Sequence, residues 1–100
     1  EAKATMNMIT CVAKEEDWHN WDRYMAIVER YLTQSQAVDP DIALQSSNAG
    51  SLALHAGQHE RALEAFRLSQ KQWVRMGRDD EALAVADRID EVKQALSSWS

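Results

Sequence analysis

Apolar side chains recur along most of the chain at intervals of three and four residues, the spacing that places them on one face of a helix. The clearest stretch is "DWHNWDRYMAIVERYLTQ". Its broad apolar stripe consists of Trp18, Trp21, Tyr24, Met25, Val28, Tyr31 and Leu32. β-Branched residues are few and strict alternation of apolar and polar positions is absent, so β-strands are not expected. The pattern predicts an all-α fold.

Four further stretches show the same spacing, which brings the expected number of helices to five. The helix over residues 2–14 has the inner positions Met6, Ile9, Val12 and Ala13. In the helix opened by Pro40 they are Ile42, Leu44, Ala49, Leu52, Ala53 and Ala56. In the helix from His59 to Met76 they are Leu63, Phe66, Ser69, Gln70 and Trp73. In the last helix they are Leu83, Ala86, Ile89, Val92 and Leu96. The connections are short, which favours antiparallel neighbours.

Local signals define the ends of the central helices. Asp39 can accept hydrogen bonds from the free backbone N–H groups of a helix start. Pro40 suits the first helical position, where a missing N–H group has no consequence. Gly57 and Gly77 follow the next two helices, and each can adopt the left-handed conformation that ends a helix. These signals predict helix–turn–helix units.

The composition is that of a single globular domain, with 45% hydrophobic and 27% charged residues over 100 positions. The net charge of −5 argues against nucleic acid as a partner, since phosphate binding requires clustered Lys and Arg. No apolar run approaches the length of about 20 residues that spans a bilayer, so no membrane partner is expected. A single cysteine, Cys11, fits a reducing, cytoplasmic compartment. The chain begins without Met, which indicates a fragment of a longer protein.

Reactive side chains are present, but each has a structural explanation. Cys11 could act as a nucleophile with His19 as its base. Its apolar neighbours on a helix favour a buried structural thiol instead. The acidic runs 15–17 and 79–81 could supply paired carboxylates for acid–base chemistry. Both runs lie at expected helix starts, where capping by Asp17 and the helix dipole account for them.

Neither a metal site nor a cofactor is expected. His55 and His59 have the four-residue spacing of metal ligands on one helix, but the turn at Gly57 separates them. The four tryptophans are Trp18, Trp21, Trp73 and Trp99. Packing between helices is the default interpretation of these residues, and an exposed anchor for a partner is the alternative. Trp99, close to the end of the chain, could cover a following repeat.

A shift of 41 residues superimposes the helix–turn–helix layout of residues 2–36 on that of residues 39–76. Asn7 then falls on Asn48, which is the one identity among the positions compared, and Val12 falls on Ala53. The layout therefore repeats more clearly than the residues do. The chain reads as hairpin 2–36, hairpin 39–76 and a closing helix over 79–97.

The second hairpin resembles the tetratricopeptide repeat. Gly50 matches the glycine where the paired helices approach closely, and Gly57 matches the turn. Ala62 and Phe66 match the small and large positions of the second helix. The departures are Ser46 in place of Trp, Ala49 in place of Leu, and Ala53 in place of Tyr. The resemblance implies about two and a half repeats stacked as a right-handed superhelix with a concave face. The alternative is a generic antiparallel helical bundle, which lacks this stacking and its concave face.

The same resemblance assigns a groove on that concave face to the first helix of each pair. The residues expected to bind a partner are Asn7, Ser47, Asn48, Ser51, His55 and Arg88. The groove also includes Lys3, Met6, Thr10 and Ala84. Asn48 and Arg88 match two positions of the clamp by which some family members hold a C-terminal carboxylate. Met6, Thr10 and Ala84 occupy other clamp positions, which argues against chaperone tails as partners. The Asn48 amide can still pair with the backbone of an extended peptide, or it can be an ordinary surface residue.

The sequence thus predicts a non-enzymatic protein–protein interaction module, or scaffold, that binds a peptide or a partner domain on its concave face. Self-association through exposed end helices is a further expectation. The alternative is a structural or regulatory helical-repeat segment of a larger bacterial regulator or kinase, packed against its own parent chain, a role in which members of this family occur.

Overall fold

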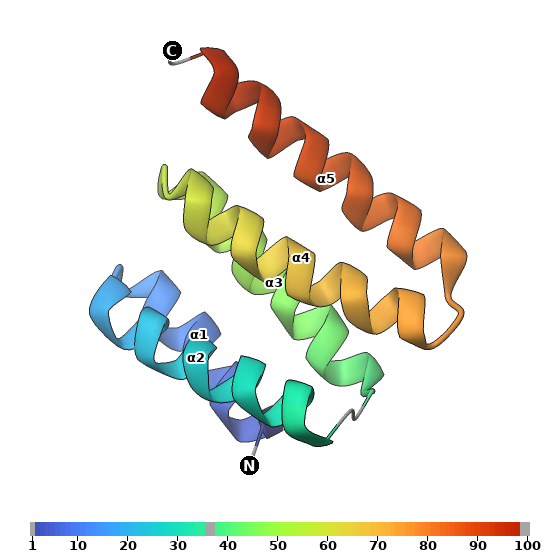
Figure 1. Cartoon of the computed structure of the whole chain (residues 1–100). Helices are drawn as coiled ribbons and strands as arrows, with labels where there is room; N and C mark the ends of the chain where they lie inside the picture. The colour runs from blue at the N-terminus through green and yellow to red at the C-terminus, as the bar shows by residue number, and fades with distance from the viewer. Residues whose placement is uncertain (1, 36–37, 99–100) are drawn as a thin grey trace.

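A computed structural model describes residues 2–35 and 38–98 and contains, within those ranges, five helices and no strand (Figure 1). The helices are α1 (Ala2–Lys14), α2 (Trp18–Ser35), α3 (Pro40–His55), α4 (His59–Arg75) and α5 (Asp79–Ser98). The predicted all-α fold is therefore confirmed, and the five helices lie where the apolar pattern places them. The last two residues of the chain, including Trp99, lie outside the described part.

The helices form two hairpins and a closing helix. α1 packs against α2, α3 packs against α4, and α5 packs against α4. The hairpins are joined by extensive packing of α1 against α3. In Figure 1, α1, α3 and α5 run in one direction while α2 and α4 run in the opposite direction. α5 lies on the side of α4 away from α2.

One apolar core continues through all five helices. Its largest fully buried side chains include Trp21, Phe66, Met6, Ile9 and Met25. Burial of such side chains provides the main driving force for packing amphipathic helices together. Trp73 is also buried and Trp18 is partly buried, so these tryptophans and Trp21 pack between helices as the default interpretation predicts.

Three of the predicted inner positions are wrong. Leu44 is 54% exposed, Leu83 is 66% exposed and Tyr31 is 46% exposed. In α5, the buried stripe consists of Ala82, Val85, Ile89 and Val92. This stripe and one through Leu83 are both compatible with helical spacing, and the packing of α5 against α4 alone selects between them. Leu44 is displaced for a similar reason, since its neighbours Ile42 and Ala43 face the core.

Three turns have the same backbone form. Each has a residue of positive φ, which is Glu16 (57°), Gly57 (79°) or Gly77 (71°). The next residue then donates a backbone hydrogen bond five residues back. These bonds are Asp17 N to Val12 O at 2.8 Å, Gln58 N to Ala53 O at 2.8 Å, and Arg78 N to Trp73 O at 2.9 Å. The first two turns coincide under the 41-residue shift.

Aspartate side chains cap the N-terminal ends of α2 and α3, as the sequence predicts. Asp39 accepts a hydrogen bond from the Asp41 backbone N–H at 2.8 Å, with Pro40 at the first helical position. Asp17 accepts one from the Asn20 backbone N–H at 3.3 Å and another from the Asn20 amide. These bonds satisfy N–H groups that a helix start leaves free.

Buried polar side chains join α3 to α4. The Ser69 hydroxyl donates to the Ala43 carbonyl at 2.7 Å. The Gln72 side-chain oxygen accepts from the Asp39 backbone N–H at 3.1 Å. Both side chains are almost fully buried, where an unpaired polar group would be destabilising. The second hairpin is thus fixed by specific bonds as well as by apolar packing.

Candidate functional site

The predicted partner-binding residues of α3 form one stripe on its surface. Asn48 and His55 are exposed, while Ser47 and Ser51 are partly buried. The spacing of Asn48, Ser51 and His55 by three and four residues places their side chains in line along the helix. Asn48 and His55 therefore face solvent, while the two serines are partly covered.

α5 adds Arg88 to this stripe. Its Nη2 atom donates to the Ser51 hydroxyl at 3.1 Å, across 37 positions of the sequence. The guanidinium carbon lies 5.5 Å from the centre of the Phe66 ring, within the range of a cation–π interaction. The carboxylate of Glu91 lies 3.7 Å from Nε. Arg88 is therefore positioned by contacts from three helices, with part of its side chain still exposed.

Asn7 lies on α1, at the other end of the predicted groove. It borders a small hollow of about 210 Å³ together with Met6, Asp41, Leu44 and Gln45. This hollow adjoins the first turns of α3, whereas Ser51 and His55 lie in its last turns. The structure thus brings Ser51 and Arg88 into contact, and it places Asn7 beside Leu44.

Met6 and Lys3 were also expected to line the groove, and the described structure confirms neither. Met6 was expected to line the groove, but its side chain is fully buried. Its sulfur atom lies 3.8 Å from the Ser46 hydroxyl, so it is part of the α1–α3 packing. The side chain of Lys3 lies outside the described part. Thr10 and Ala84 are partly buried and exposed, respectively.

Cys11 also differs from the expectation, because its thiol is exposed rather than buried. The buried neighbours Ile9, Val12 and Ala13 take the core-facing positions of α1. Cys11 is next to them in sequence but points to a different face of the helix. Its apolar neighbours in the sequence therefore gave a misleading signal.

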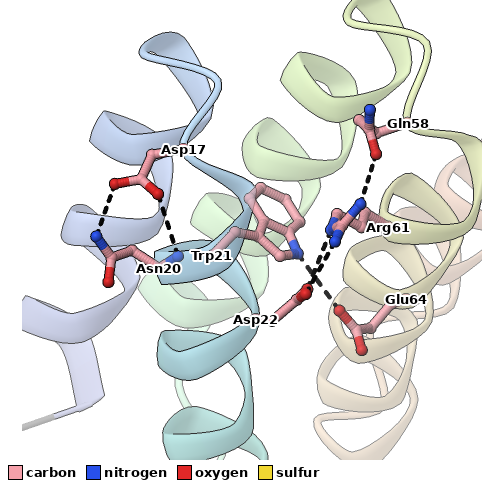
Figure 2. A network of polar contacts seen from close by, with 7 residues as sticks. All are labelled: Asp17, Asn20, Trp21, Asp22, Gln58, Arg61 and Glu64. Carbon is pink, nitrogen blue, oxygen red and sulfur yellow. Dashed lines mark hydrogen bonds and ion pairs between the residues drawn. The ribbon is translucent and has the colours of Figure 1, made fainter.

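A polar network between α2 and α4 was not foreseen (Figure 2). Trp21 is fully buried, and its indole N–H donates to the Glu64 carboxylate at 3.4 Å. Arg61 holds both carboxylate oxygens of Asp22, with Nε–Oδ1 at 3.0 Å and Nη2–Oδ2 at 2.8 Å. Arg61 also donates to Gln58 at 2.6 Å. Trp21 and Asp22 lie 43 and 39 positions from their partners in α4, and no signal in the sequence pairs them.

This network has an electrostatic consequence for Glu64. Burial of its carboxyl group raises its pKa, and the nearby Glu29 carboxylate raises it further. The hydrogen bond from Trp21 acts in the opposite direction, because it stabilises the charged form. Asp22, by contrast, raises the pKa of the Arg61 guanidinium through their hydrogen bonds. The N-terminal halves of α2 and α4 are therefore joined by charges as well as by Trp21.

Among residues 2–35 and 38–98, no group of three or more His, Cys, Asp or Glu side chains is arranged to hold a metal ion. Within the same ranges, no helix has the length and apolar character needed to cross a bilayer. In comparisons with models of protein families, with curated protein sequences and with solved structures, nothing matches this chain.

Proposed function

We propose that this chain is a tetratricopeptide-like, non-enzymatic interaction module that binds an extended peptide along α3. The observation that carries the proposal is the contact between Arg88 and Ser51. It makes side chains of α3 and α5 converge on one surface, with Asn48 and His55 exposed beside them. Amide, hydroxyl, imidazole and guanidinium groups together offer both donors and acceptors to a peptide backbone. The proposal places the module in the cytoplasm, where the Cys11 thiol would stay reduced.

The hollow beside Asn7 could hold one end of the peptide. Leu44, which is 54% exposed, borders this hollow of about 210 Å³. An apolar side chain of the peptide would fit against Leu44, while its backbone would continue past Asn48 toward Arg88. Apolar anchors with a few polar contacts are the usual pattern of such sites.

Selection of peptides from a random library tests the proposal, followed by calorimetry on the selected peptides. Asn48→Ala and His55→Ala change exposed side chains and should leave the fold intact. Together they should weaken binding by about tenfold, since each removes a polar contact. Arg30→Ala with Gln34→Ala on the exposed side of α2 is the matched control, and binding should be unchanged. A library that yields only peptides insensitive to Asn48→Ala and His55→Ala would contradict the assignment.

A further inference from the structure

An open groove of about 910 Å³ lies between α2 and α4, toward the C-terminal ends of both helices. The N-terminal halves of the same helices are bridged by the Trp21–Glu64 and Asp22–Arg61 contacts (Figure 2). Leu32 and Leu68 are buried along the groove, and Val74 stands at its edge with 61% of its surface exposed. The apolar surface that this α2–α4 groove offers to a partner is therefore mainly that of Val74. It does not include the residues proposed above to bind a peptide.

Three cations line the groove from one helix. Arg67, Lys71 and Arg75 follow each other at four-residue spacing along α4, and all three are exposed. Within residues 2–35 and 38–98, the ion pairs formed by arginines involve Arg61, Arg78 and Arg88, and none involves these three cations. Eight residues of helix place them along about 12 Å. Their charges are available to a partner with carboxylates at similar spacing.

Two carboxylates also face this groove, at its opposite end. Glu29 projects from α2 and Glu64 from α4, where Glu64 already accepts the hydrogen bond from Trp21. The groove is therefore basic toward the C-terminal end of α4 and acidic near the bridge. A partner helix with its acidic segment at the basic end would avoid the two carboxylates.

The chain contains a helix with the complementary surface. Over residues 79–98, six Asp and Glu residues stand against two Lys and Arg residues, a net charge of −4 out of −5 for the chain. Exposed carboxylates of α5 include Asp79, Asp80, Asp87 and Asp90. Leu83 lies among them and is 66% exposed, the largest exposure of a large hydrophobic side chain in the described part of the protein. The outer face of α5 is thus an acidic surface around one apolar residue.

We propose that the α2–α4 groove of one copy binds the acidic outer face of α5 from a second copy. α5 of the same copy cannot reach this groove, because it packs on the side of α4 away from α2 (Figure 1). Leu83 would contact Val74, while Asp87 and Asp90 would pair with Arg67 and Lys71. Contact between unlike surfaces either closes reciprocally into a dimer or continues head to tail.

Sedimentation velocity over a range of protein concentrations at low salt is the test. The wild-type chain should associate, and added salt should weaken the association because the pairing is electrostatic. Arg67→Glu with Lys71→Glu should raise the dissociation constant at least about tenfold, and so should Asp87→Lys with Asp90→Lys. An equimolar mixture of these two variants should associate again, since each retains the surface that the other has lost.

A matched control separates this groove from charge in general. Arg23→Glu with Arg30→Glu reverses two cations on the outer surface of α2, away from the groove, and should leave the association unchanged. Circular dichroism checks that every variant remains helical. The proposal is overturned if the wild-type chain is monomeric at all concentrations, if the control weakens association as strongly as the groove variant does, or if the mixture fails to associate.

Discussion

Gly50 and Phe66 pack so closely that a single added carbon would collide with the ring. A Cβ atom at Gly50 would lie 2.7 Å from Cε1 and 2.8 Å from Cδ1 of Phe66. The ring is fully buried and the Arg88 guanidinium lies over it, so a shift of the ring would disturb these contacts. The approach of α3 to α4 therefore depends on glycine at position 50.

Gly50→Ala should lower the free energy of unfolding by about 1–3 kcal/mol, through overpacking against Phe66. The sign of this change distinguishes two effects, because helix propensity alone predicts that Gly50→Ala raises the free energy of unfolding by about 1 kcal/mol. Urea denaturation followed by circular dichroism measures the difference. Adding Phe66→Leu should make Gly50→Ala less harmful, as a double-mutant cycle would show. A more stable Gly50→Ala variant would contradict the close contact.

Glu16 adopts a positive φ at a position where the two equivalent turns have glycine. Glu16→Gly should raise the free energy of unfolding by about 0.5–1 kcal/mol, since relief of the left-handed conformation exceeds the extra entropy of the unfolded chain. Gly57→Ala should lower it by about 1–2 kcal/mol, because alanine resists that conformation. Glu15→Gly, one position earlier, is the control and should bring no gain. Thermal or urea denaturation measures all three.

Glu64→Gln should become more stabilising, relative to the wild type, as the pH rises. The folded chain holds the Glu64 proton to higher pH than the unfolded chain, because burial raises the pKa above its ordinary value of 4.5. Below that value Glu64 is protonated in both the folded and the unfolded chain, so it does not lower the free energy of unfolding of the wild type. As the pH rises through it and then through the raised pKa, the charged carboxylate destabilises the wild type, and glutamine avoids this.

The measurement is the free energy of unfolding of both proteins at several values between about pH 4 and about pH 8. Glutamine still offers an oxygen to the Trp21 indole N–H, so the hydrogen bond need not be lost. Glu60→Gln, an exposed change on the same helix, should not show the rise. A constant difference between Glu64→Gln and the wild type would show that Glu64 is well solvated.

Cys11 should react with a thiol reagent in the folded protein at a rate close to that of a small free thiol, because its side chain is exposed. Stopped-flow labelling without denaturant measures the rate. The same reaction in urea gives the reference for the unfolded chain, and Ile9→Cys in a Cys11→Ser background gives a buried thiol for comparison. Slow labelling of Cys11, similar to that of the buried thiol, would contradict its exposure.

Local features of this fold could be predicted from the sequence, and features that depend on neighbours could not. The cap at Asp39 and the turns at Gly57 and Gly77 involve residues close in the chain, so their chemistry is visible there. The exposure of Leu44 and Leu83 depends on which helix packs beside each one. Helical spacing leaves two stripes open in each case, and only the tertiary arrangement selects one.

The polar contacts show the same limit. Arg88 and Ser51 were both expected at the binding face, but their hydrogen bond spans 37 positions and no spacing rule relates them. The contacts of Trp21 with Glu64 and of Asp22 with Arg61 span 43 and 39 positions. Such pairs follow from the relative placement of whole helices, which local propensity does not determine.

The side-chain bridge between α2 and α4 connects the two hairpins at the N-terminal halves of these helices. The two hairpins pack against each other mainly through α1 and α3, which lie behind α2 and α4 in Figure 1. In front, side chains of Trp21, Asp22, Arg61 and Glu64 span the distance at one end. The bridge therefore adds side-chain contacts between α2 and α4 to the packing of α1 against α3, so the first hairpin is held against the second along both pairs of helices.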